Sequence, residues 1–241
     1  MTSLSQDLAG QIAVVTGASR GIGEAIAYSL AIRGAHVVIT ARTAGGLEAL
    51  EDRIHNAGGS ATIAPLDLTD GDSIARLAAA IAERWNKLDM LVLNAAMLGT
   101  LTPVAAIDGK EFNKTLTLNL IAQQALIANF DPLLRRSAAG KLMALTSSVA
   151  TEPRAYWGAY AASKAALETL ITSYGAEMRN ISTLRTAILN PGGTRTAMRA
   201  RAYPGEDPSS IKGTDAVGEF VAERMVEGFD STARFNLPKV M

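Results

Sequence analysis

The sequence predicts an α/β protein, a doubly wound Rossmann fold with a parallel sheet of six to seven strands and helices on both faces. Short, almost continuously apolar runs alternate with longer amphipathic stretches along the 241 residues, which is the order that βαβ units require. The runs lack a polar alternate face, as expected for strands that helices cover on both sides. Nothing marks an internal boundary, so we expect one domain over residues 1–241.

Each apolar run predicts a strand, and the runs are Gln11–Thr16, Ala35–Ala41, Ser60–Leu66, Leu88–Leu93, Gly140–Ser147 and Ser182–Leu189. The amphipathic stretches predict helices at about 21–33, 46–56, 70–86, 108–136, 158–179 and 214–228. Asp70 and Asp108 stand where N-caps are expected. Ligands of doubly wound sheets bind beyond the carboxyl ends of the strands. The residues that follow each strand are therefore the candidate site.

The charge balance argues against several kinds of partner. The chain has 23 Lys plus Arg against 23 Asp plus Glu, and no basic run of the kind that nucleic acids or anionic membranes attract. No apolar run is long enough to span a bilayer, and Met1 to Gly10 has no signal pattern. We therefore expect a cytoplasmic protein that binds neither nucleic acid nor membrane.

The scarcity of cysteine and histidine restricts the possible chemistry. The chain has no cysteine, and its two histidines, His36 and His55, have no second metal ligand at helical spacing. We expect no metal, no thiolate nucleophile and no histidine-based triad. Catalysis must then use Ser, Tyr, Lys, Asn or a cofactor.

A glycine-rich turn follows the first predicted strand and leads into the first helix. It runs Thr16-Gly17-Ala18-Ser19-Arg20-Gly21-Ile22-Gly23. Glycines allow a tight turn and close backbone approach, and a helix start offers unpaired N–H groups to a pyrophosphate. The turn predicts a dinucleotide site, although glycine-rich turns are common in α/β proteins, and the candidate cofactor-binding residues in it are Gly17, Ser19, Arg20, Gly21, Ile22 and Gly23.

The end of the second strand favours NADP(H) over NAD(H). An NAD site places an acidic residue here to bind the ribose hydroxyls, whereas this chain has Thr40-Ala41-Arg42-Thr43. Arg42 and Arg20 could converge on a 2′-phosphate, because guanidinium binds phosphate through charge-assisted contacts. The alternative is that both arginines are solvated surface charges.

Short polar side chains also follow the third and fourth strands. Asp67 and Leu68 follow one strand, and Asn94 and Ala95 follow the other. Such side chains could bind an adenine or order the neighbouring strand ends, and either could simply be a cap or turn residue.

The residues after the fifth strand suggest proton-transfer chemistry. Ser147-Ser148 ends the strand, and Tyr160 and Lys164 lie four residues apart on one face of the next helix. A nearby ammonium favours the ionised form of a phenol, so Tyr160 is a candidate general acid/base. A surface tyrosine with a lysine one turn later is the alternative.

Taken together, these motifs resemble the short-chain dehydrogenase/reductase family in its single-domain form, over about residues 8 to 200. The glycine turn, the acidic strand tip Asp67, the Asn94-Ala95-Ala96 segment and the Tyr160-to-Lys164 pair each match a family motif. Asn119 takes the place of the family's helix asparagine. The family's Pro-Gly segment matches Asn190-Pro191-Gly192-Gly193-Thr194-Arg195-Thr196.

The resemblance implies hydride transfer between NADP(H) and a carbonyl or secondary-alcohol substrate. Tyr160 would be the general acid/base, and Lys164 would lower its pKa and bind the nicotinamide ribose. Ser148, preferred over Ser147, would hydrogen-bond the substrate oxygen. Asn119 would hold a water that links Lys164 to solvent. The remaining cofactor contacts would include Pro191, Gly192, Thr194 and Thr196, with the two threonines anchoring the carboxamide.

Some expectations concern substrate choice and assembly. Residues 194–212 resemble the family's mobile substrate loop, and its arginines Arg195, Arg199 and Arg201 could recognise an acidic group or be solvated. Tyr156 and Trp157 could form an aromatic wall.

A homo-oligomer is expected, but Thr232–Pro238 lacks the family's glycine-rich closing strand, which puts the usual tetramer in doubt. In the Asn94-Ala95-Ala96 segment, Ala96 replaces the glycine of the family motif. A dinucleotide-binding sensor or scaffold is the alternative function.

Overall fold

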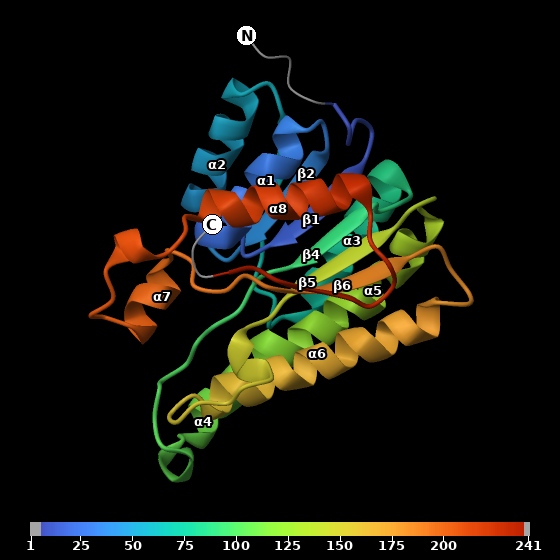
Figure 1. The fold of residues 1–241 in the computed structure, drawn as a ribbon. Helices are drawn as coiled ribbons and strands as arrows, with labels where there is room; N and C mark the ends of the chain where they lie inside the picture. The colour runs from blue at the N-terminus through green and yellow to red at the C-terminus, as the bar shows by residue number, and fades with distance from the viewer. Residues whose placement is uncertain (1–5, 239–241) are drawn as a thin grey trace.

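Seven parallel strands form one sheet in the computed structural model, which describes residues 6–238 (Figure 1). The strand order is β3-β2-β1-β4-β5-β6-β7. The predicted doubly wound Rossmann fold is confirmed. The strands are β1 Ile12–Thr16, β2 His36–Ala41, β3 Ser60–Pro65, β4 Met90–Leu93, β5 Lys141–Leu145, β6 Arg185–Asn190 and β7 Ala233–Asn236.

Helices cover both faces of the sheet, and each face has its own apolar core. One core joins the strands to α1, α2 and α8, and the other joins them to α3, α5 and α6. The strands are apolar on both sides because both sides are buried. The helices are α1 Gly21–Ile32, α2 Ala44–Asn56, α3 Gly71–Trp85, α4 Gly109–Leu116, α5 Ala122–Arg136, α6 Gly158–Met178, α7 Ala197–Ala202 and α8 Thr214–Glu227.

The predicted helix 108–136 is interrupted in the structure. A π-helical segment, Thr117–Ile121, lies between α4 and α5. Its wider turn changes the hydrogen-bond ladder, and the side chain of Gln123 donates a hydrogen bond of 2.8 Å to the carbonyl of Leu118. Both predicted N-caps are confirmed: Asp70 accepts from the backbone of Asp72, and Asp108 accepts from that of Glu111. The π segment places Asn119 in the interior.

A closing strand that the list of predicted strands did not contain forms within Thr232–Pro238. Although this segment has no glycine, Ala233–Asn236 forms β7 and pairs in parallel with β6. Phe235 supplies the apolar anchor, because its ring packs edge-on against those of Phe220 and Phe229 at 5.5 and 6.0 Å. Two half-buried residues alternate with two exposed ones in this strand, which makes its sequence signal weak.

The strand order reverses between β1 and β4, where β1 has β2 on one side and β4 on the other. A ligand site is expected beyond the carboxyl ends at this switch point. None of the helices within residues 6–238 is long and apolar enough to cross a membrane. Residues 1–5 of the Met1-to-Gly10 stretch lie outside the described residues, and the predicted cytoplasmic location stays a prediction.

Candidate active site

The glycine turn lies between β1 and α1 in a conformation that its glycines make accessible. Gly17 and Gly21 have φ values of +66° and +65°, which side-chain-bearing residues rarely adopt. Arg20 is the N-cap of α1 and makes no side-chain cap hydrogen bond. The backbone N–H groups of the first turn are therefore not taken by a capping side chain, and they suit an anionic ligand.

Asn94 fastens the turn to the tip of β4. Its side-chain amide donates to the carbonyl oxygens of Thr16 and Gly17 at 2.8 and 3.2 Å. The hydroxyl of Thr16 in turn accepts from the backbone N–H groups of Asn94 and Ala95, both at 3.0 Å. Of the three roles considered for Asn94, which were adenine binding, ordering of the neighbouring strand ends and a cap or turn residue, these contacts perform the second.

We expect Gly23→Ala to disrupt this turn. A Cβ at position 23 would meet the Asn94 amide and the Gly17 carbonyl well inside van der Waals contact. Overpacking of this kind costs about 1–3 kcal/mol, and it would also displace the anion-binding turn. Urea unfolding should show a lower free energy of unfolding, and NADPH titration should show a lower affinity. Gly109→Ala is the matched control, since a Cβ there meets nothing within 4 Å, and an equally mild effect of both changes would contradict the prediction.

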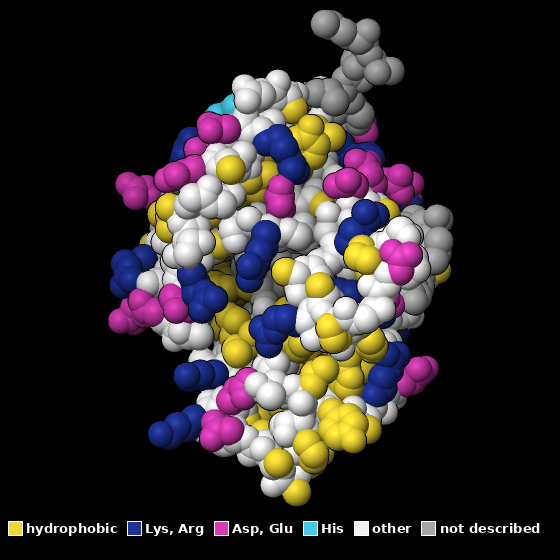
Figure 2. All heavy atoms as spheres, turned by 90° about the vertical axis from the view of Figure 1, so that its left-hand side faces the viewer, with side chains coloured by type: hydrophobic (Ala, Val, Ile, Leu, Met, Phe, Trp, Pro, Cys, Tyr) yellow, Lys and Arg dark blue, Asp and Glu magenta, His cyan; other side chains and the backbone are white. Residues whose placement is uncertain are grey.

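The tip of β2 lies next to the glycine turn. The backbone N–H of Ala18 donates to the carbonyl of Thr40 at 3.0 Å, so Arg20 and Arg42, each two residues away from this bond, belong to adjoining segments. Both arginines are exposed. Figure 2 views the side of the molecule on which α7 lies, and Lys and Arg side chains surround a hollow there.

Asp67 follows β3 and forms a local turn. One carboxylate oxygen accepts from the backbone N–H and the hydroxyl of Thr69, at 2.9 and 2.8 Å. These hydrogen bonds, and to a smaller extent the charge of Arg42, lower the pKa of Asp67. Leu68 beside it is buried. The carboxylate of Asp67 therefore stays ionised at neutral pH.

Tyr160 and Lys164 are buried together on α6, with 7% and 2% of their surfaces exposed. The Lys164 ammonium lies 5.9 Å from the Tyr160 ring centroid and donates to the carbonyl of Leu145, at the end of β5, at 2.8 Å. Burial raises the pKa of Tyr160 to about 12 and lowers that of Lys164 to about 8. Within residues 6–238, the Tyr160 hydroxyl makes no hydrogen bond. It is thus a protonated phenol with its donor available.

Glu168 lies one turn beyond Lys164 and was not predicted. It is almost fully buried, and its two carboxylate oxygens accept from the Thr146 hydroxyl at 2.6 Å and from Arg234 of β7 at 2.7 Å. Its negative charge raises the pKa of Lys164 and so opposes the effect of burial. The seventh strand is therefore linked electrostatically to the Tyr160 and Lys164 pair.

Asn119 is fully buried, and its side chain is engaged with the protein. The amide donates to the carbonyl of Met97 at 2.9 Å and to the Ser163 hydroxyl at 3.0 Å, and its oxygen accepts from the Met97 N–H at 2.8 Å. Ser163 lies on α6 beside Lys164. The side chain thus joins the π segment, the chain after β4 and α6, and a water-holding role stays a prediction.

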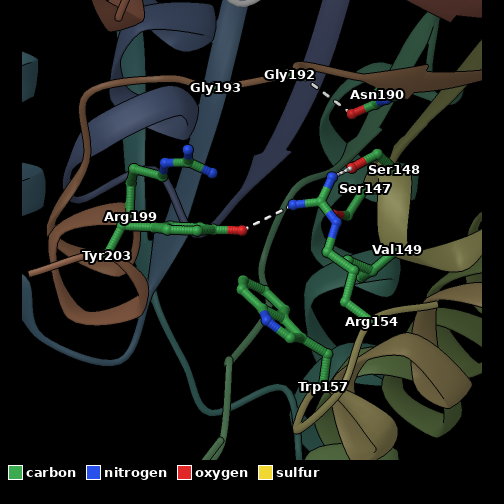
Figure 3. Close-up of a pocket in the computed structure, with 10 residues that line it drawn as sticks. All are labelled: Ser147, Ser148, Val149, Arg154, Trp157, Asn190, Gly192, Gly193, Arg199 and Tyr203. Atoms are coloured by element: carbon green, nitrogen blue, oxygen red, sulfur yellow. Dashed lines mark hydrogen bonds between the residues drawn. The ribbon is translucent and has the colours of Figure 1, made fainter. Parts of the chain in front are cut away.

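A cavity of about 260 Å³ opens beside these residues (Figure 3). Arg154 projects into it, donating to the Ser148 hydroxyl at 3.3 Å and to the Tyr203 hydroxyl at 2.8 Å. The Trp157 ring lies 6.1 Å from that of Tyr160 and 5.7 Å from that of Tyr203. The lining residues follow the ends of β5 and β6, precede the start of α6, or belong to α7 and its C-terminal end. They are Ser147, Ser148, Val149, Arg154, Trp157, Asn190, Gly192, Gly193, Arg199 and Tyr203.

The predicted aromatic wall is half right. Trp157 lines the cavity, but Tyr156 is 60% exposed and does not. Tyr156 has a φ of +72°, and its side chain lies away from the cavity that its neighbour lines. The second aromatic wall is Tyr203 from the predicted substrate loop.

The segment after β6 partly encloses the cavity. Thr194 is buried, and its hydroxyl donates hydrogen bonds to the carbonyl oxygens of Pro191 and Gly192 at 3.1 and 3.4 Å. Thr196 caps α7 by accepting from the Arg199 N–H at 3.1 Å. Both threonines make local contacts, and the predicted carboxamide contact stays a prediction.

The three loop arginines differ in their surroundings. Arg199 lines the cavity and pairs with both carboxylate oxygens of Glu206, at 2.6 and 2.8 Å. Arg201 donates to the carbonyl of Gly99 at 3.1 Å, and Arg195 is exposed. Arg154, which sequence reasoning missed, enters the same cavity from the loop before α6. Its position six residues before Tyr160 was the available signal.

Comparisons with known proteins agree with this arrangement. A family model described as short chain dehydrogenase matches residues 11–207. An uncharacterized oxidoreductase of Escherichia coli K12, YciK, is 37% identical over 211 residues, which cover 86% of this chain and 83% of YciK.

Solved structures are similar over almost the full length. A Pseudomonas syringae chain assigned to the short chain dehydrogenases superposes with a TM-score of 0.91 at 33% identity, covering 98% of this chain and 96% of its own. A protein of Escherichia coli CFT073, solved in complex with NADPH, has a TM-score of 0.88 at 35% identity, with 96% and 98% covered.

Proposed function

Because this chain belongs to the short chain dehydrogenase family, we propose that it transfers a hydride between NADP(H) and a carbonyl or secondary-alcohol substrate. The observation that carries the proposal is the buried Tyr160 and Lys164 pair beside a cavity that Ser148 lines. The proposed unit is a single NAD(P)-binding domain with a substrate segment at 194–212, working as a homo-oligomer.

The residues of the glycine turn fit a dinucleotide. Its positive-φ glycines and the α1 start without a side-chain cap suit a pyrophosphate, and Arg20 and Arg42 suit a 2′-phosphate. Asp67 and Leu68 would face the adenine, and Pro191, Gly192, Thr194 and Thr196 the nicotinamide end. When bound, the nicotinamide supplies or accepts the hydride.

The protein would supply the proton and hold the substrate. Tyr160 donates its phenolic proton to the carbonyl oxygen during reduction, and takes it back in the oxidation direction. Its raised pKa keeps the proton in place until the oxygen becomes basic. Ser148 hydrogen-bonds the same oxygen where negative charge develops, and the ammonium of Lys164 stabilises the phenolate that forms.

The test of this function is NADPH oxidation, followed by the absorbance of the reduced cofactor, with a panel of aldehydes, ketones and oxo acids. We expect turnover with at least one class. Tight NADPH binding without turnover of any substrate in either direction would refute the enzyme and favour a sensor or scaffold.

We expect NADPH to bind more tightly than NADH, and Arg42→Ala to remove most of the difference. Losing a charge-assisted phosphate contact should weaken NADPH binding about tenfold or more and leave NADH binding unchanged. Fluorescence titration measures both affinities. Arg179→Ala, an exposed arginine at the end of α6, is the control. Equal affinities of the wild type for the two cofactors would contradict the assignment.

A further inference from the structure

The cavity beside Ser148 contains a guanidinium that the proposed reaction does not use. Figure 3 shows the Arg154 side chain reaching across the cavity, with its guanidinium between Ser148 and Tyr203. Its two donors reach Ser148 Oγ at 3.3 Å and Tyr203 Oη at 2.8 Å. Both partners are neutral hydroxyls, and because the Arg154 side chain is exposed, its charge is balanced by solvent and not by a carboxylate.

The two arginines of the cavity differ in whether a carboxylate pairs with the guanidinium. Arg199 is paired with both oxygens of Glu206 and stacks on the Tyr203 ring at 3.7 Å. For Arg154, no carboxylate lies within 4.0 Å among residues 6–238. Arg154 is therefore the cation in this cavity that is free to bind an anionic ligand, and guanidinium matches a carboxylate in planar geometry.

The short distance from Arg154 to Ser148 restricts the shape of the anion. If Ser148 binds the carbonyl oxygen of the substrate, a carboxylate that reaches the guanidinium must lie close to that carbonyl along the carbon chain. The aromatic rings of Trp157 and Tyr203 bound the rest of the cavity and suit an apolar substituent.

We propose that Arg154 binds the carboxylate of a 2-oxo or 3-oxo acid, or of the corresponding hydroxy acid, whose carbonyl or hydroxyl oxygen lies at Ser148. This inference rests on the proposed function, since it places the reacting oxygen at Ser148. It assigns anion recognition to Arg154 and not to the three arginines of segment 194–212.

Non-reducible amide acids test the site by binding alone. Oxamate and malonamate carry their carboxylate at the 2-oxo and 3-oxo spacing, succinamate carries it farther away, and oxamide is the neutral counterpart of oxamate. In the NADP⁺-loaded protein, calorimetry should give at least one of the first two an affinity about 10- to 100-fold above that of oxamide. Succinamate should bind no better than oxamide.

Variants assign the effect to the charge of Arg154. Arg154→Met should abolish the preference for the acid, and Arg154→Lys should restore part of it. Tyr203→Phe removes the hydroxyl bridge across the cavity without removing the charge, so the preference should survive. Arg179→Met is the matched control outside the cavity. An acid preference that persists in Arg154→Met, or that disappears equally in Tyr203→Phe, would overturn the proposal.

Turnover separates this inference from the proposed function. NADPH oxidation by neutral ketones, combined with equal affinities for oxamate and oxamide, would uphold hydride transfer and overturn the carboxylate site. Arg154-dependent oxamate binding without NADPH oxidation by any carbonyl compound would uphold the site as an anion site and refute the reaction.

Discussion

Tyr160→Phe should lower kcat for carbonyl reduction by about 10²- to 10⁴-fold, the contribution of a positioned general acid. The change removes the proton donor and little else, because the Tyr160 hydroxyl makes no hydrogen bond within the described residues. The ring contact with Trp157 at 6.1 Å remains available to phenylalanine. We therefore expect unchanged thermal stability and nearly unchanged NADPH affinity, measured beside the steady-state kinetics.

Tyr174→Phe is the matched control on the same helix. The Tyr174 hydroxyl donates to Asp131 at 2.7 Å, on the side of α6 that packs against α5. Its loss should cost about 1–3 kcal/mol of stability, since a hydrogen bond to a charged group is removed, and should leave kcat unchanged. If Tyr160→Phe kept kcat within tenfold of the wild type on every substrate, another group would have to be the acid.

The fold could be predicted because its signals are repeated along the chain. Each parallel strand needs an apolar run, and each crossover needs an amphipathic helix, so one misplaced boundary does not change the architecture. β7 was missed because it is short and half exposed, and it depends on the aromatic packing of Phe235. The break near Asn119 was missed because the π segment is only five residues long, and residues 110–131 contain no glycine or proline that would mark an interruption of a helix.

The candidate site was predictable only where local sequence carries the geometry. The glycine turn and the Tyr160 and Lys164 pair are local patterns, and the structure has them at the carboxyl edge of the sheet. Arg154 and Glu168 depend on contacts with Tyr203 and Arg234, which are distant in the chain. The position of Arg154 six residues before Tyr160 could have placed it near the site, but no pattern in the sequence reports its contact with Tyr203 or the contact of Glu168 with Arg234.

Lys164→Met should also lower kcat strongly, by about 10²-fold or more, because an ammonium beside a forming phenolate stabilises the transition state of proton transfer. In the wild type, kcat/KM for reduction should fall above about pH 8, where Lys164 loses its proton. The variant should lack this decline. The pH profile distinguishes the electrostatic role of Lys164 from simple packing, since methionine is apolar and of similar length.

The same substitution should change how stability depends on pH. In the folded protein the pKa of Lys164 is about 8, below the ordinary value of 10.5, so between these values the unfolded chain binds more protons and stability rises with pH. Below pH 8 this gain is absent. Urea unfolding at pH 7 and pH 10 should therefore show the wild type gaining about 3 kcal/mol relative to Lys164→Met. Parallel curves for the two proteins would mean that burial does not depress the Lys164 pKa, and the predicted decline of kcat/KM would then have to come from another group.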